Sequence, residues 1–237
     1  MFLLISTVAI IAAIMFIASK WQGSQPIKEI EIKGNAYIDE TYIRNLIYSD
    51  VLSKKPEDID FDLVKQKIFK IPLIAECKIV NSYPEKAIFL ITNENIISRA
   101  KSSDNTMYLF TESGSLINLE ELKSNGMIFK NKNFDNLPLV NFIGTLSDNK
   151  SSNNKDLVEF IRVYNKLKMG SIIKSIWRGN MGISCNLQDN KEVIFGNMVN
   201  MESKFEKFLT FTDKVISREN LNINLIDLRW KNQIIVK

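Results

Sequence analysis

The sequence predicts an α+β protein in three parts: a single N-terminal transmembrane helix, a small βααββ domain, and a strand-rich C-terminal domain with two helices. An uncharged apolar run opens the chain, and a strand, two amphipathic helices and two further strands follow it. Short alternating runs separated by polar turns fill the rest, which predicts a mixed α/β domain with a curved, mainly antiparallel sheet. The expected boundaries are 1–20, 27–93 and 94–237.

Residues 2–19 carry no charge. At about 1.5 Å per residue, a helix over this run is close to the length needed to cross the bilayer core of about 30 Å. Lys20 and Trp21 follow directly, as is typical of the headgroup region. A cleaved secretion signal is the alternative, because Ala18 and Ser19 are small, although no basic residue precedes the run. Both readings export the rest of the chain. The side chains expected to contact lipid are Phe2, Leu3, Leu4, Ile5, Ile10, Ile11, Ile14, Phe16 and Ile17.

The segment 27–93 has the order of a βααββ domain. Residues 27–33 alternate between apolar and charged side chains, which predicts a strand. Asp39 and Asp60 stand where each could cap a helix. Two more alternating runs, 74–80 and 86–92, predict strands. A sheet this small needs both helices on one face to bury a core.

Beyond residue 94, short strands are interrupted by two amphipathic helices. The first ends near Gly170, a candidate C-cap, and the second begins at about Asn200. The last fifteen residues, 223–237, predict two alternating strands joined by a tight connection. A terminal strand often lies at the edge of a sheet, and an open edge is either an aggregation hazard or a docking site.

The composition excludes several classes of function. Lysine and arginine are scattered and the net charge is only +4, so no nucleic-acid-binding surface is indicated. The chain has no histidine, which removes the commonest general base and zinc ligand. Cys77 and Cys185 are too few for a metal cage and are either buried thiols or a disulfide. A carboxylate pair of Glu94 and Glu112 is conceivable, but nothing in the sequence indicates that they meet. We therefore expect no enzyme activity, metal, cofactor or small-molecule substrate.

Several short motifs follow one another in an order that is more specific than any one of them alone. They are IKEIEIKGN (27–35), the stretch 60–95 with Tyr83-Pro84 in a turn, ISRA (97–100), LFTESGSLI (109–117), LPLVNFIG (137–144) and IDLRWKNQIIVK (226–237). Together they resemble the bacterial cell-division family FtsQ/DivIB, in which a POTRA domain precedes a β domain. The chain departs from the family pattern at Thr111 or Glu112, where an Asp is usual, and at Trp230, where a Tyr is usual.

The resemblance implies a non-enzymatic scaffold of the bacterial divisome. Such a protein sits in the inner (cytoplasmic) membrane, is enriched at the septum, and has its body in the periplasm or outside. Its implied partners are small bitopic proteins of the FtsB/FtsL type and the septal peptidoglycan synthase complex. Arg229 and Trp230 match the family's Arg-Tyr pair in the partner-binding strand. The resemblance and the alternation of the last strand give the expected partner-binding residues: Arg229, Trp230, Asn232, Ile234 and Val236.

Two alternatives stay open at this point. Trp230 could pack into the core of the β domain while Arg229 pairs with a neighbouring acid. The whole chain could instead be an exported, POTRA-containing chaperone-like module for outer-membrane or secreted polypeptides. Such a module would lose residues 2–19 and bind many unfolded chains instead of one defined partner.

Overall fold

The computed structural model describes residues 10–18, 21, 25–82, 85–130, 133–143, 154–197, 200–216, 223–230 and 233–237. The chain forms two compact units. The first consists of Met1–Glu94 with Gly126–Lys132, and the second of Asn95–Asn125 with Asn133–Lys237. The fold is α+β, and most of its strands lie in one large sheet.

The expected transmembrane helix over residues 1–20 is wrong. No helix in the described part of the chain combines the length and the apolar character needed to cross a membrane. The described helical residues in this part of the chain are 10–18 and Trp21. Of the proposed anchor residues, Ile10, Ile11, Ile14, Phe16 and Ile17 are exposed, whereas Phe2, Leu3, Leu4 and Ile5 lie outside the described residues.

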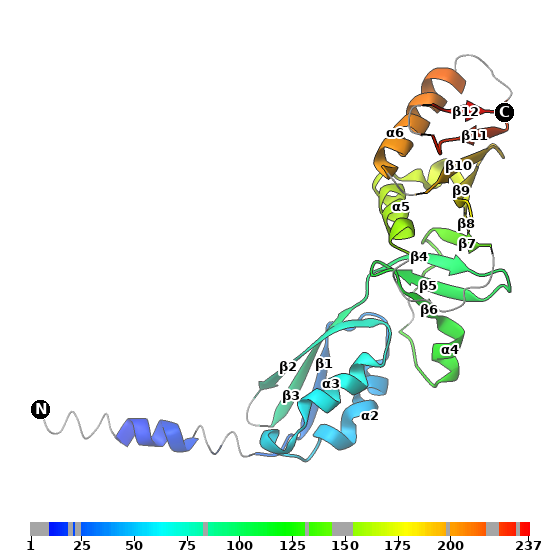
Figure 1. Ribbon diagram of the computed structural model, residues 1–237. Helices are drawn as coiled ribbons and strands as arrows, with labels where there is room; N and C mark the ends of the chain where they lie inside the picture. The colour runs from blue at the N-terminus through cyan, green and yellow to red at the C-terminus, as the bar shows by residue number, and fades with distance from the viewer. Residues whose placement is uncertain are drawn as a thin grey trace, which may run out of the picture. The chain divides into compact units, whose positions relative to one another are not determined.

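In the first unit a three-stranded sheet is covered on one side by two helices (Figure 1). Its elements are β1 (Glu29–Lys33), α2 (Glu40–Val51), the 3₁₀ turn η1 (Pro56–Asp58), α3 (Phe61–Phe69), β2 (Ile74–Ser82) and β3 (Lys86–Asn93). The central strand β3 pairs in parallel with β1 and antiparallel with β2. Asp39 caps α2 by accepting from the Thr41 N–H, and Asp60 caps α3 by accepting from the Leu63 N–H. Both caps are those that the sequence predicted.

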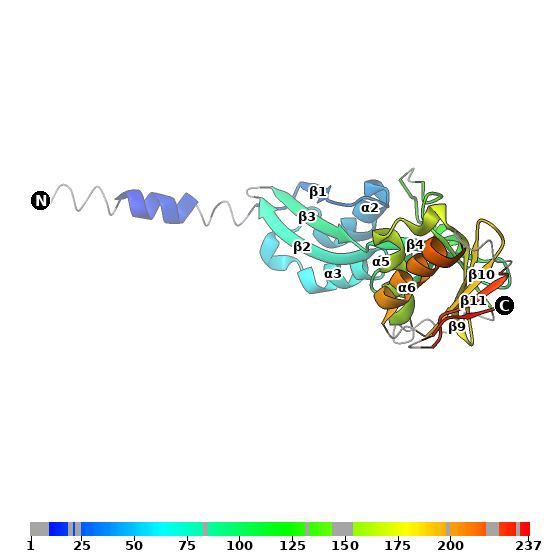
Figure 2. The ribbon, with the colours of Figure 1, turned by 90° about the horizontal axis from the view of Figure 1, so that it is seen from above.

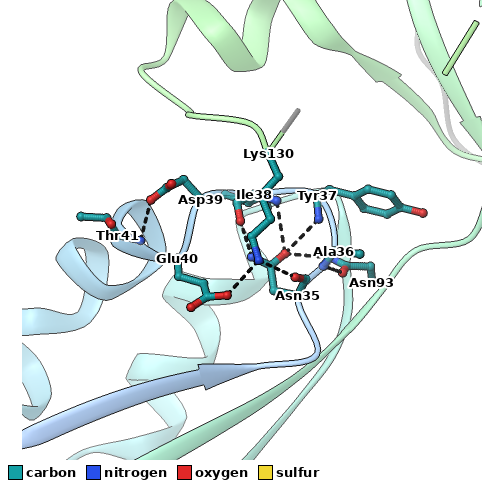
Figure 3. Close-up of polar contacts among 9 residues, drawn as sticks. All are labelled: Asn35, Ala36, Tyr37, Ile38, Asp39, Glu40, Thr41, Asn93 and Lys130. Atoms are coloured by element: carbon teal, nitrogen blue, oxygen red, sulfur yellow. Dashed lines mark hydrogen bonds and ion pairs between the residues drawn. The ribbon is translucent and has the colours of Figure 1, made fainter. Parts of the chain in front are cut away.

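The connection between β1 and α2 is held by a buried asparagine. Gly34 has φ +82°, and a Cβ there would lie 2.4 Å from the Ile91 carbonyl oxygen, so only glycine fits. The next residue, Asn35, accepts from the N–H groups of Tyr37 and Ile38 at 3.3 Å and donates to the Ile38 carbonyl at 2.5 Å (Figure 3). The side chain of Asn35 thus replaces the backbone partners that this turn lacks.

Residues 126–130 pack against the same turn although they are distant in sequence. Their backbone bonds to residues 37–39 through two hydrogen bonds of 2.8 Å. Lys130 Nζ donates to the Asn35 carbonyl oxygen at 2.9 Å and to Glu40 Oε1 at 2.8 Å, as Figure 3 shows. The first unit is therefore completed by a segment that follows it in the chain by more than thirty residues.

Replacing Asn35 by alanine is expected to destabilise the first unit. The change leaves buried N–H and C=O groups without partners, which costs about 1–3 kcal/mol. Asn45→Ala is the matched control, because Asn45 is exposed on α2 and alanine favours helix there. Urea unfolding of the full chain, followed by circular dichroism, measures both. Equal midpoints for Asn35→Ala and the wild type would contradict the role given to Asn35.

The second unit is built on a nine-stranded sheet. Its strands are β4 (Ile96–Lys101), β5 (Met107–Thr111), β6 (Leu116–Asn118), β7 (Leu139–Phe142), β8 (Ile173–Gly179), β9 (Gly182–Leu187), β10 (Glu192–Gly196), β11 (Leu225–Asp227) and β12 (Ile235–Val236). Its helices and helical turns are α4 (Leu119–Ser124), α5 (Lys155–Lys166), η3 (Met169–Ser171), α6 (Met201–Phe211) and the π-helical turn η4 (Thr212–Ile216).

The sheet runs in the order β12-β11-β10-β9-β8-β7-β4-β5-β6. Most described strand pairs are antiparallel, and the parallel ones are β4 with β7, β7 with β8, and β10 with β11. Helices α5 and α6 lie along one side of strands β8 to β11 (Figures 1 and 2). This arrangement leaves β12 and β6 at the two ends of the sheet.

The core of the second unit lies between these helices and the sheet. Phe160 of α5, Phe195 of β10 and Phe205 of α6 are fully buried. Their ring centroids are 4.7–5.3 Å apart, and Phe160 meets Phe195 edge to face. Leu167, which directly follows the last residue of α5, is exposed.

Three local features differ from the sequence predictions. Helix α4 was not expected, although Asn118 caps it by accepting from two backbone N–H groups. Gly170 is not the C-cap of α5, since Lys168 takes the left-handed conformation at φ 53°. The closing strands are shorter than the alternation indicated, and Trp230 lies outside both.

Both cysteines are free and buried. Cys77 lies on β2 in the first unit and Cys185 on β9 in the second. Burial raises the pKa of both thiols, and that of Cys185 well above its ordinary value. The two cysteines are therefore buried thiols and not a disulfide. They are inert because burial disfavours the thiolate form.

Candidate partner-binding edge

Strand β12 is the end strand of the nine-stranded sheet and pairs with β11 on one side. Lys237 exchanges both backbone hydrogen bonds with Leu225, at 3.0 and 3.1 Å. In an antiparallel ladder the next pair along does not exchange hydrogen bonds. That pair is Val236 with Ile226, so the N–H and C=O of Val236 point away from β11. The open side of β12 thus presents a backbone donor and a backbone acceptor.

Ile234 and Val236 are two residues apart and so lie on the same face of this extended segment. Ile234 is half-buried and packs against the core, next to an apolar depression formed with Phe211 and Val215. Val236, two residues on, is 40% exposed. Ile226, its neighbour on β11, is fully buried. Among the described residues no strand pairs with the outer side of β12, and a further strand there would cover the apolar side chains of this edge.

Arg229 follows β11, and its side chain forms an ion pair with Asp227, the last residue of that strand. Its Nη2 lies 2.6 Å from Asp227 Oδ2, and its Nε lies 3.0 and 3.1 Å from the two carboxylate oxygens. The Arg229 backbone N–H also donates to Asp227 Oδ1 at 3.0 Å. Asp227 is buried and Arg229 is partly exposed. The alternative that Arg229 pairs with a neighbouring acid is thus correct, although its guanidinium still reaches the surface.

Gly196 at the end of β10 makes room for the Arg229 side chain. It has φ +69°, and a Cβ there would lie 2.5 Å from Arg229 Cγ. Any other residue would be strained and would displace the arginine. The position of Arg229 therefore depends on a glycine from another strand.

A second arginine lies in the same cleft. Arg178 from the end of β8 and Arg229 line a cleft of about 350 Å³ together with Asp156, Gly179, Asn180, Met181, Gly182 and Asn197. The Nη2 atom of Arg178 is 3.9 Å from Asp156 Oδ2, a loose ion pair. Met181 is 71% exposed, and its Sδ lies 4.0 Å from Arg229 Nη1. The cleft offers two guanidinium groups and a flexible apolar side chain, which suits an acidic and apolar peptide segment.

The predicted partner-binding residues are placed as follows. Arg229 reaches the cleft, Ile234 and Val236 lie on the edge, and Asn232 is outside the described residues. Trp230 is 52% exposed, so the alternative that it packs into the core is wrong. Sequence reasoning missed Arg178 and Met181, because only the order of the sheet brings the β8–β9 turn close to β11.

Lys204 of α6 was also missed. It is buried, and its Nζ donates to the carbonyl oxygens of Phe195 at 2.7 Å and Asn197 at 2.5 Å. Burial lowers the pKa of Lys204, and the nearby charge of Asp227 opposes that change. Lys204 is three residues after Met201 and four before Phe208, which puts it on the buried face of the helix. This spacing could have predicted from the sequence that Lys204 is buried. Lys204 holds the segment after β10, where Asn197 lines the cleft.

The Asp227–Arg229 pair predicts a dependence of stability on pH. The hydrogen bonds from Arg229 lower the pKa of Asp227 in the folded chain. The pair therefore stabilises the fold fully above the unfolded carboxyl pKa of about 3.9, and this contribution is lost as the pH falls through the lower folded value. Urea unfolding at pH 7 and pH 3 should show a smaller loss of stability for Asp227→Asn than for the wild type. Equal losses would contradict this assignment.

Among the described residues, no group of three or more Cys, Asp or Glu side chains could hold a metal ion. Glu112 is bound by Asn95 and Arg162, whose hydrogen bonds lower its pKa.

A family model described as FtsQ/DivIB, C-terminal related, matches residues 97–236, more than half of the chain. The chain belongs to this family. The matched range contains Arg178, Arg229 and the β11–β12 pair. Membership gives the protein a role in cell division, in a family of non-enzymatic division scaffolds whose members act with protein partners at the division-site membrane. No curated protein matches the chain.

Proposed function

We propose that the protein is a non-enzymatic scaffold of the bacterial divisome whose β12 edge accepts a strand from a small bitopic division protein of the FtsB/FtsL type. The scaffold would link this partner to septal cell-wall synthesis, with both units outside the cytoplasm. The observation that supports the proposal best is the position of β12 at the end of the nine-stranded sheet, where no described strand pairs with its outer side. Strand addition uses such an edge: backbone hydrogen bonds give affinity, and alternating side chains give selectivity.

The cleft specifies the chemistry of the added strand. Arg229 keeps its Nη1 away from Asp227 and next to Met181. Arg178 is held only loosely by Asp156. A partner carboxylate bound in this cleft would meet the two guanidinium groups, and charge-assisted hydrogen bonds of this kind are the strong ones. We therefore expect the partner segment to carry an acidic residue next to an apolar alternating run.

The first unit supports a second element of the proposal. Its order of strand, two helices and two strands, with both helices on one side of the sheet, is that of a POTRA domain. In a scaffold, this unit would offer a further docking surface for other division proteins, separate from the β12 edge. The boundaries expected from the sequence, 27–93 and 94–237, remain a proposal for the two domains.

Trp230→Ala tests the partner-binding surface. Because Trp230 is half exposed, its truncation should leave the melting temperature unchanged. As an anchor of the interface, its loss should weaken partner binding by about 2 kcal/mol, roughly thirtyfold. The measurement is binding of the FtsB/FtsL ectodomain to the full chain, with a melting curve for each variant.

Tyr48→Ala is the matched control, since Tyr48 is an equally exposed aromatic residue on α2 of the first unit. It should leave binding unchanged. Unchanged binding by Trp230→Ala would remove Trp230 from the interface. Binding of many unfolded polypeptides by the wild type, without preference for the division protein, would favour the chaperone-like alternative.

A further inference from the structure

The second unit has another cleft, far along the sheet from β12. It has a volume of about 520 Å³ and is lined by residues of β4, β7, α5, η3 and β8 and the segments beside them. None of its lining residues belongs to the cleft of Arg178 and Arg229. Its volume lies in the range of sites for small molecules.

The cleft is lined by cations and carries no acid. Arg99, Lys168 and Lys174 line it, and no lining residue has a carboxylate. Arg99 Nη1 is 2.8 Å from Asp135 Oδ1, which offsets part of its charge. In the part of the chain that the structure describes, no carboxylate lies within ion-pair distance of Lys168 or Lys174. The uncompensated positive charge favours an anion of more than one charge.

Two residues that line the cleft also carry hydrogen-bond donors, which favour an anionic ligand. The Nε–H of Arg99 is buried and has no partner among the described residues. A buried donor of a charged group without a partner is costly. The second donor is the Tyr164 hydroxyl, which lies over Gly170, 3.3 Å from where a Cβ would be. Burial raises the pKa of Tyr164, so the hydroxyl stays protonated and can donate.

We infer that this cleft binds a small, multiply charged oxyanion, a phosphate-bearing or polycarboxylate molecule. The Arg99 guanidinium and the Tyr164 hydroxyl, which belong to lining residues, would donate to its oxygens. Lys168 and Lys174, which are exposed at the cleft, would neutralise its charge. The proposal is independent of the β12 edge, because the two sites share no residue.

The test is calorimetric titration of the full chain with pyrophosphate and, separately, with citrate at low ionic strength. The cleft variant is Lys168→Gln with Lys174→Gln. The control is Lys123→Gln with Lys155→Gln, two exposed lysines of the same unit outside the cleft, which changes the net charge equally. We expect the wild type and the control to bind, and the cleft variant to bind at least tenfold more weakly.

Binding of pyrophosphate alone would assign a phosphate-bearing ligand, and binding of both probes a site for oxyanions in general. No binding of either probe by the wild type would overturn the proposal. Equal weakening in the cleft variant and the control would overturn it too, because general charge screening would then explain the signal. Circular dichroism of each variant verifies that the fold is kept.

Discussion

Val236→Pro is expected to abolish strand addition at β12 while leaving the second unit folded. Proline has no N–H, so the outward donor of Val236 is lost. The same N–H takes no part in the pairing with β11, where the neighbouring Lys237 exchanges hydrogen bonds with Leu225. Proline is tolerated at such an edge position. We expect at least a tenfold loss of affinity for the division partner with a small change in melting temperature.

Two control variants distinguish the loss of the outward N–H of Val236 from the loss of its side chain and from the loss of strand pairing with β11. Val236→Thr keeps the N–H and the β-branched shape, so it should bind nearly as the wild type does. Ile235→Pro removes an N–H that faces β11, and it should lower the stability of the β11–β12 pair as well as binding. Full binding by Val236→Pro would show that the partner does not add to this edge.

Phe205→Ala should strongly destabilise the second unit. Phe205 is fully buried and contacts Phe160 and Phe195 at ring distances of 5.2 and 4.7 Å. Truncating such a residue leaves a cavity between α5, α6 and β10 and costs about 3–5 kcal/mol. The fluorescence of Trp177 and Trp230, both in the second unit, follows the transition in urea.

Phe211→Ala on the same helix is the matched control, because Phe211 is half-buried and its loss opens a smaller cavity. It should cost clearly less than Phe205→Ala. A similar cost for the two would mean that the aromatic cluster is not the centre of the core. Because α6 also carries Lys204, which holds the segment at Asn197, loss of this core should weaken partner binding as well.

Local signals in the sequence were sufficient for most elements. Asp39 and Asp60 marked two helix starts, because a side chain that accepts from the first turn is a local property. The alternation of β8, β9 and β10 and the buried faces of α5 and α6 were read in the same way. Helix α4 was missed although Asn118, followed by Glu120 and Glu121, was a usable start signal. The uncharged run and the flanking Lys20 and Trp21 led to the wrong membrane helix over residues 2–19.

The candidate site depended more on long-range geometry. Arg229 was found because it is adjacent to the terminal strand and matches a family position. Arg178 is about fifty residues away, and only the sheet order β8-β9-β10-β11 brings it to the same cleft. Likewise, the donor set of Arg99, Tyr164 and Lys168 comes from separate elements that no sequence pattern connects. Residue type and spacing predict elements, and the pairing of strands decides which side chains share a site.

Amide hydrogen exchange at Val236, with and without the division-partner ectodomain, tests the central claim most directly. The N–H of Val236 points to the open side of β12, so it should exchange rapidly in the free protein. On partner binding it should become protected, because the added strand supplies an acceptor, while the Ile235 N–H, which faces β11, should change little. Rapid exchange of Val236 in a saturated complex, with new protection elsewhere on the chain, would contradict strand addition at β12.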